Sequence, residues 1–144
     1  MYQVLPNLYV SDFASVMNSD KQFFQVNCAV ELPDVCDRFV HVPLCDADEP
    51  QFRPEWSHDF RASLPHVLPK IHSELKHGRK VVVHCYAGRQ RSCAMVATYL
   101  MWKFRFALAD AVEYVKRANP VAFEQGVHYR DALEAFEKEI KDWF

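Results

Sequence analysis

The sequence is poor in glycine and contains no long apolar run. Only three of its 144 residues are glycine. No Gly- or Ser-rich linker divides the chain, so residues 1–144 are predicted to form one domain. No segment approaches the ~20 apolar residues of a transmembrane helix, and the first residues lack the basic and apolar regions of a secretory signal. We therefore expect no membrane association and a location in the cytoplasm, or also in the nucleus.

The sequence also lacks a large excess of either positive or negative charge. Lys and Arg number 17 against 19 Asp and Glu, a net charge of −2. Because this balance lacks the basic footprint of a nucleic-acid-binding protein, no nucleic-acid partner is expected. The five cysteines show no C-x-x-C pairing typical of a zinc site, so no zinc site is predicted. Their thiols are expected to be reduced, which leaves a cysteine available as a nucleophile.

Predicted strands alternate with predicted helices along the chain. Such alternation predicts an α/β fold: one domain with a central, mostly parallel, twisted sheet flanked by helices. The continuous apolar run 81–83 is typical of a strand buried on both faces. The expected strands are 2–5, 8–10, 28–32, 38–42 and 81–83. The expected helices are a short one from Ser57 that ends at Pro65, another from 67 to 75 that stops at Gly78, an entirely apolar one over 92–102, and two amphipathic ones over 108–118 and 129–140.

The segment between strand 81–83 and the apolar helix carries the strongest functional signal. A strand–loop–helix junction directs backbone N–H groups and the positive end of the helix toward one point, which favours an anion. Gly88 lets this loop curl tightly, and Arg91 can reach back to hold a tetrahedral oxyanion with two N–H groups. The predicted site is a Cys85 thiolate within a phosphate-sized cradle formed by Tyr86, Ala87, Gly88, Arg89, Gln90 and Arg91.

The residues from His84 to Ser92 resemble the H-C-x-x-G-x-x-R-S signature of cysteine-dependent protein tyrosine phosphatases. Other segments resemble the small, stand-alone dual-specificity branch of that superfamily, namely 8–10, the V-P-x-x-D loop over 42–46, and the A-x-x-x-V-K helix over 111–116. The resemblance breaks after this helix. There the branch usually reads R-P followed by P-N, whereas this chain has Arg117-Ala118-Asn119-Pro120 and then Phe123-Glu124-Gln125, and the role of residues 123–125 is left open.

The resemblance implies a role for each matching residue. Cys85 would attack phosphorus, while Arg91 and the loop amides hold the phosphoryl oxygens. Asp46 would protonate the leaving oxygen; it is preferred over Asp48 because only Asp46 has the right spacing from Pro43. Ser92 would donate a hydrogen bond to the thiolate, and His84 would order the loop. The resemblance implies that no metal or other cofactor takes part.

The implied function is hydrolysis of phosphotyrosine and phosphoserine/threonine in proteins, so the expected partners are phosphorylated protein substrates. Two alternatives stay open: a phosphatase for phosphoinositides or RNA 5′-phosphates, and a non-catalytic module that binds phosphoproteins. The sequence leaves open the physiological substrate and whether the protein is a monomer or a dimer. It also leaves open whether Cys45 or Cys93 forms a regulatory disulfide with Cys85 or simply fills the core.

Overall fold

The computed structural model describes residues 1–45 and 53–141, and within them five strands form one sheet in the order β1-β2-β5-β3-β4. β1 (Tyr2–Leu5) and β2 (Leu8–Ser11) form an antiparallel hairpin. β2 then pairs parallel with β5 (Val81–His84), β5 with β3 (Phe24–Asn27), and β3 with β4 (Phe39–His41). The predicted α/β domain with a mostly parallel sheet is confirmed.

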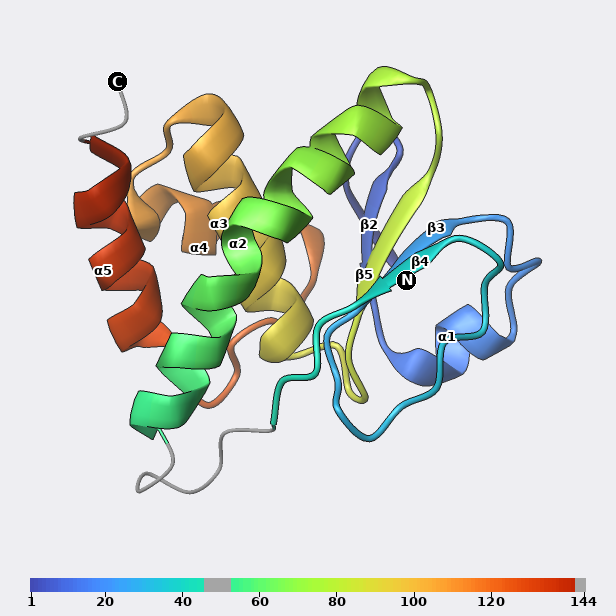
Figure 1. Cartoon of the computed structure of the whole chain (residues 1–144), viewed down its shortest axis with the longest axis horizontal. Helices are drawn as coiled ribbons and strands as arrows, with labels where there is room; N and C mark the ends of the chain where they lie inside the picture. The colour runs from blue at the N-terminus through green and yellow to red at the C-terminus, as the bar shows by residue number, and fades with distance from the viewer. Residues whose placement is uncertain (46–52, 142–144) are drawn as a thin grey trace.

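The helices cover the sheet unequally. Figure 1 shows most of the helices gathered on one side of the sheet, and the short α1 (Phe13–Met17) on the other. The larger layer consists of α2 (Arg53–Lys76), α3 (Arg91–Phe104), α4 (Leu108–Ala118) and α5 (Arg130–Lys141). No helix among the described residues combines the length and apolarity needed to cross a bilayer.

β5 and α3 form the centre of the molecule. All four residues of β5 are buried, and α3 is buried continuously from Arg91 to Met101. A strand buried on both faces and a helix that is apolar all round are stable only inside a protein. The loop that joins them, residues 85–90, is therefore anchored at both ends in the core.

The strand predicted over 28–32 is wrong: β3 lies four residues earlier, at Phe24–Asn27. β3 contains two fully buried polar residues, and both bond to the chain that follows. Gln25 Oε1 accepts hydrogen bonds from the backbone N–H groups of Val35 and Cys36. Asn27 donates to Leu32 O and accepts from Ala29 N. These bonds let polar side chains occupy a central strand, while the segment 28–32 folds as an irregular loop.

The helix break expected at Pro65 is also wrong, because α2 runs through both Pro65 and Pro69. A proline inside a helix removes one backbone hydrogen bond to the residue four positions earlier. Both prolines are exposed, so the affected carbonyl groups lie on the solvent side. The opposite face buries Phe60, Leu64, Val67, Leu68 and Ile71, and this continuous apolar contact holds the helix together across the prolines.

Candidate active site

Cys85 follows β5 directly and lies beside the first turn of α3. Its side chain is buried, with 3% of its surface exposed. The Sγ atom lies 3.2 Å from the Oγ atom of Ser92, which is fully buried. A hydroxyl at this distance can donate a hydrogen bond to a thiolate. The structure thus brings two of the predicted site residues into direct contact.

Gly88 shapes the loop between Cys85 and α3. Its φ angle is +70°, in the left-handed region that favours glycine. A Cβ atom at this position would lie 2.8 Å from Asp12 N and 2.9 Å from the carbonyl carbon of Ser11. The loop is also tied to the same place by a hydrogen bond from Phe13 N to Tyr86 O. Only glycine allows the loop to approach the β2–α1 junction this closely.

The side chains of the loop mostly turn away from its interior. Tyr86, Ala87 and Arg89 are exposed. Gln90, the N-cap of α3, makes no side-chain hydrogen bond to the helix. Its amide instead bonds to Gly126 O and His128 N, at 2.7 and 3.1 Å. The N-terminal turn of α3 therefore lacks a side-chain cap, which suits an anion that bonds to backbone amides.

Arg91 is almost fully buried and forms a two-point ion pair with Glu31. Its Nη2 and Nη1 atoms lie 2.5 and 2.8 Å from the two Glu31 carboxylate oxygens. Nη1 also donates to Leu44 O at 2.9 Å. The hydrogen bonds from Arg91 lower the pKa of the Glu31 carboxyl, so it is ionised at neutral pH. This pairing fixes the plane of the guanidinium beside Cys85.

Glu31 was not predicted as a site residue, because the segment 28–32 that contains it was predicted to be a strand. The end of β3 at Asn27 instead places Glu31 in the loop at the carboxyl edge of the sheet, where β5 also ends. Ligand sites in parallel sheets lie beyond the carboxyl ends of the strands. Had the strand been predicted to end at Asn27, Glu31 would have been placed in the loop beside the site.

His84 is fully buried and held in one tautomer. Gln25 Oε1 accepts from two backbone N–H groups, so its Nε2 atom faces His84 Nε2 at 2.7 Å and donates to it. The imidazole proton therefore lies on Nδ1, which is 3.4 Å from Cys85 O. Burial lowers the pKa of His84, so the ring is neutral at pH 7. The Phe13 ring packs against it, with 5.7 Å between centroids.

Asp46, predicted as the general acid, lies outside the described residues. The chain immediately before it is held at the site by two contacts. Leu44 O accepts from Arg91, and Cys45 O accepts from the Tyr129 hydroxyl at 2.7 Å. The backbone that leads into Asp46 therefore passes beside the guanidinium of Arg91.

The segment from Asn119 to His128 forms a further wall of the site. The Asn119 amide donates to Gly88 O at 2.8 Å, and Phe123 N donates to Arg89 O at 2.9 Å. Arg89 and Glu124 form an exposed ion pair, 3.6 Å apart. These elements enclose a cavity of about 190 Å³, lined by Cys85, Ala87, Arg89, Gln90, Arg91, Glu124, Gln125 and His128. His128 was not singled out from the sequence, since it lies outside every matched motif.

All five cysteines are free thiols. Cys93 is fully buried; its thiol lies 3.3 Å from Gly88 O, and burial raises its pKa to about 12. Cys93 therefore supports the loop as a neutral thiol, whereas Cys45 is exposed. A disulfide between Cys85 and either residue stays a prediction. In the described parts of the chain, no group of three or more His, Cys, Asp or Glu residues is arranged to hold a metal ion.

Comparison with protein families gives one match over most of the chain. The family described as "Dual specificity phosphatase, catalytic domain" matches residues 8–139. Among curated proteins, the chain is 30% identical to dual specificity protein phosphatase 18 of Pongo abelii, over 91% of this chain and 73% of that protein. It is 39% identical to putative tyrosine phosphatase 123R of Invertebrate iridescent virus 6, over 46% and 47%.

The curated relatives differ in length. The chain spans about half of the viral protein and 30% of human dual specificity protein phosphatase 9, to which it is 28% identical over 80% of its own length. Solved structures share the fold. Human DUSP28 is similar with a TM-score of 0.78 and 21% identity, covering 100% of both chains. A mouse putative dual specificity phosphatase complexed with zinc tungstate has a TM-score of 0.76 and 22% identity, over 99% and 89%.

Proposed function

The chain belongs to the dual-specificity phosphatase family of cysteine-dependent protein phosphatases, and on that premise we propose that it hydrolyses phosphotyrosine and phosphoserine/threonine in proteins. The observation that carries this proposal is the contact between Cys85 Sγ and Ser92 Oγ at 3.2 Å, inside a loop that Arg91 closes. A thiol with a hydroxyl donor at a helix N-terminus is suited to nucleophilic attack on a bound phosphate ester.

In the first step, the Cys85 thiolate attacks phosphorus opposite the leaving oxygen. The S–P bond forms as the P–O bond breaks, while Arg91 and the amides of the loop hold the three other oxygens. Asp46 gives its proton to the leaving oxygen. This assignment is supported by the anchoring of Leu44 O and Cys45 O, which leads the chain to Asp46 past Arg91.

In the second step, water attacks the cysteinyl-phosphate. A new O–P bond forms, the S–P bond breaks, and its electron pair returns to Cys85. Ser92 donates a hydrogen bond to the departing thiolate, and the Asp46 carboxylate takes a proton from the water. Side chains and water supply everything that this reaction needs.

His84 takes no proton in this scheme. Its Nε2 atom accepts from Gln25, and its Nδ1–H group faces Cys85 O, so the ring fixes the backbone of the nucleophile. Glu31 acts similarly on Arg91: a carboxylate that bonds both terminal nitrogens fixes the guanidinium in one plane. Both are positioning residues in the proposed mechanism.

The cavity is small for a ligand pocket. The cavity holds about 190 Å³, which is below the ~300–1,000 Å³ typical of pockets that enclose a whole small molecule. In the proposed substrate scope, a phosphate on serine or threonine reaches Cys85 as well as one on tyrosine. The nucleophile must stay reduced, so we place the protein in a reducing compartment, the cytoplasm or also the nucleus.

The test is a comparison of kcat/KM across substrate classes. Phosphotyrosine and phosphothreonine peptides of matched sequence, a phosphoinositide and a 5′-triphosphorylated RNA would be assayed, with Cys85→Ser as the inactive control. We expect turnover of both peptides, faster for phosphotyrosine because its phenolate leaves more easily. A preference for the lipid or the RNA would contradict the proposed substrate class. Binding of the peptides without turnover would contradict catalysis itself.

A further inference from the structure

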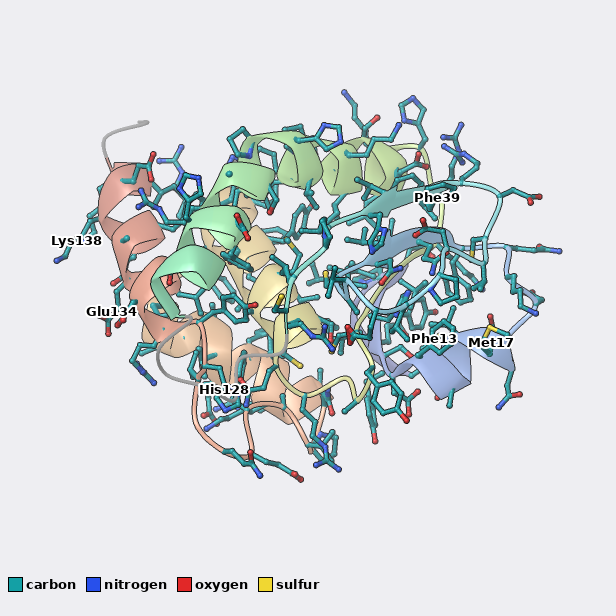
Figure 2. All side chains as sticks on the ribbon, turned by 60° about the horizontal axis from the view of Figure 1, so that its bottom comes forward. Phe13, Met17, Phe39, His128, Glu134 and Lys138 are labelled. Carbon is teal, nitrogen blue, oxygen red and sulfur yellow. The ribbon has the colours of Figure 1, made fainter. Side chains whose placement is uncertain are left out.

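Two consecutive carbonyl groups of the loop between β5 and α3 bond to the segment that follows α4. The side-chain amide of Asn119 donates to Gly88 O at 2.8 Å, and Phe123 N donates to Arg89 O at 2.9 Å. The sequence departs from the dual-specificity pattern within this segment. Figure 2 shows its last residue, His128, on the loop that leads into α5. The mechanism above uses the N–H groups of the loop but does not explain what orients them.

The bonded carbonyl groups determine where the next N–H groups point. In a planar trans peptide, the C=O and N–H bonds point in opposite directions, and no peptide bond of the described residues is cis. Because Gly88 O and Arg89 O face the segment after α4, the N–H groups of Arg89 and Gln90 face the inside of the loop, on the side of Cys85. Neither N–H group donates to another group in the described parts of the chain. Successive N–H groups on one side of a loop form a binding site for an anion.

The peptide unit after Gly88 is the one that the chain itself fixes least. The φ angle of Gly88 is +70°, and glycine adopts positive and negative φ angles with similar ease. A bond from outside the loop is therefore needed to hold this peptide in one orientation. The thiol of Cys93 also lies 3.3 Å from Gly88 O, but a thiol is a weak donor. The Asn119 amide is the stronger of the two donors.

Asn119 is itself held in one orientation. Its side chain is buried, and its backbone N–H group donates to Val115 O at the end of α4. Its Oδ1 atom accepts from Val121 N at 3.1 Å, so Nδ2 is the atom that faces Gly88 O. The donor is thus in place before any anion enters the loop.

We propose that Asn119 is a positioning residue of the phosphate-binding loop: it holds the Gly88 carbonyl group outward and so directs the Arg89 N–H group at the phosphoryl group beside Cys85. This inference rests on the proposed function, in which the loop amides hold the phosphoryl oxygens. Asn119 acts through Gly88, needs no contact with the substrate, and neither gains nor loses a proton.

Two substitutions separate the two bonds of the Asn119 side chain. In Asn119→Ser, the hydroxyl oxygen can still accept from Val121 N, because serine and asparagine stabilise the same kind of turn, but it is too short to reach Gly88 O. Asn119→Ala loses both bonds. Thr98→Val is the matched control. Thr98 is fully buried and donates to Ala94 O at 2.8 Å within α3, so this variant loses a buried bond of the same kind away from the loop.

The experiment measures by calorimetry how tungstate, a tetrahedral oxyanion shaped like phosphate, binds to the full chain and its variants. We expect Kd to rise about tenfold in both Asn119 variants, because one hydrogen bond to the charged oxyanion is misaligned. The value of kcat/KM for 4-nitrophenyl phosphate should fall by a similar factor. Thr98→Val should bind tungstate as the wild type does, even if its urea midpoint falls as far.

The amide proton of Arg89 gives a more direct signature. In a proton–nitrogen correlation spectrum of the wild type, its resonance should move to higher frequency when tungstate binds, as expected for a new hydrogen bond to an anion. The movement should be smaller in Asn119→Ser. The same movement in both proteins would contradict the proposed orientation of this group.

Three binding results would overturn the inference. They are a wild-type Kd in Asn119→Ser, a Kd in Thr98→Val as weak as in Asn119→Ser, or no tungstate binding by the wild type. The urea midpoint shows whether each variant is folded, and Asn119→Ser carries the test if the alanine variant is not. Failure of the proposed function looks different. In that case tungstate binds with the expected difference between the variants, but the wild-type protein does not hydrolyse 4-nitrophenyl phosphate.

Discussion

The loop of residues 84–92 and the segments around it build the same site in different ways. The loop is a continuous stretch between a buried strand and a buried helix, and it supplies Cys85, Arg91 and Ser92. The surrounding segments, 28–34, 42–45 and 119–129, come from distant parts of the chain. They contribute Glu31, the backbone carbonyl groups of Leu44 and Cys45, and His128.

The loop is positioned by residues close to it in the sequence, whereas the surrounding segments depend on contacts between residues far apart in the sequence. The geometry of the loop follows from its own sequence, because Gly88 permits the turn and β5 and α3 fix both ends. Two of the surrounding segments are positioned by single side chains that reach across the fold: Tyr129 holds Cys45 and Gln90 holds His128. Segment 28–34 is shaped by Asn27 at its start and reaches the site through the pair of Glu31 and Arg91. Loss of the Cys85 thiol from the loop should therefore abolish chemistry outright, whereas changes around the loop should alter individual steps.

The largest effect outside the loop is expected for Asp46→Asn. Loss of the proton donor should lower kcat for alkyl phosphates by about 10²–10⁴-fold. The loss should be smaller for 4-nitrophenyl phosphate, whose leaving group hardly needs a proton. Steady-state kinetics on both esters, with Asp48→Asn as the matched control, tests the assignment. Equal losses on the two esters, or a larger effect from Asp48→Asn, would identify a different acid.

Gly88→Ala should break the loop itself. Both Gly88 and Gly78 have positive φ angles, +70° and +74°, but only a Cβ atom at Gly88 meets backbone within 4 Å. The two alanine variants share the cost of a left-handed alanine, so their difference isolates the contact with Asp12. We expect kcat/KM to fall about 10²-fold in Gly88→Ala, because the loop must shift. Gly78→Ala should keep wild-type activity; comparable losses in both would show that the close approach does not matter.

A smaller loss is expected when Glu31 no longer holds Arg91. Glu31→Gln keeps the shape but removes the charge, and kcat/KM should fall about tenfold because the guanidinium is less well fixed. Glu113→Gln is the control, since Glu113 pairs with Arg117 on the exposed face of α4. The pH dependence of stability should change as well. The lowered pKa of Glu31 means that its contribution to stability is present above pH 4.5 and is lost as the pH falls through its folded pKa. Unchanged kcat/KM in Glu31→Gln would remove Glu31 from the site.

The smallest effect concerns His84 and the stability of the fold. Burial lowers its pKa below 6.5, so the unfolded chain binds a proton at a pH where the folded chain does not. The free energy of unfolding should therefore decrease as the pH falls below 6.5. In His84→Gln, an amide oxygen can still accept from Gln25, and the decrease between pH 7 and pH 5 should be smaller. Urea unfolding at several pH values measures it, and an identical pH dependence in both proteins would contradict the neutral, buried histidine.

The sequence predicted most of the fold because its strongest signals are local. The apolar run 81–83, the apolar helix from Ser92 and the amphipathic stripes of α4 and α5 each show their burial in their own periodicity. β3 could not be found this way, since Gln25 and Asn27 are polar yet buried, and only their bonds to residues 29–36 make that possible. α2 was divided in error because its prolines are tolerated only on the exposed face of a helix whose other face is packed.

The candidate site divides in the same way. The motif from His84 to Ser92 could be predicted residue by residue. Glu31 and His128 could not, because neither has a neighbour in the sequence that marks it. Glu31 reaches Arg91 across 60 positions, and His128 is placed by Gln90 across 38.

The central claim is that Cys85 carries the phosphoryl group between the two steps. The most direct test is rapid acid quench of the wild-type protein during turnover of a phosphotyrosine peptide, followed by peptide mass spectrometry, with Cys85→Ser treated in the same way. We predict a mass increase of one phosphoryl group on the peptide that contains Cys85, and neither the adduct nor turnover in Cys85→Ser. Turnover by Cys85→Ser, or a phosphoryl group on any other residue of the wild-type protein, would contradict the account.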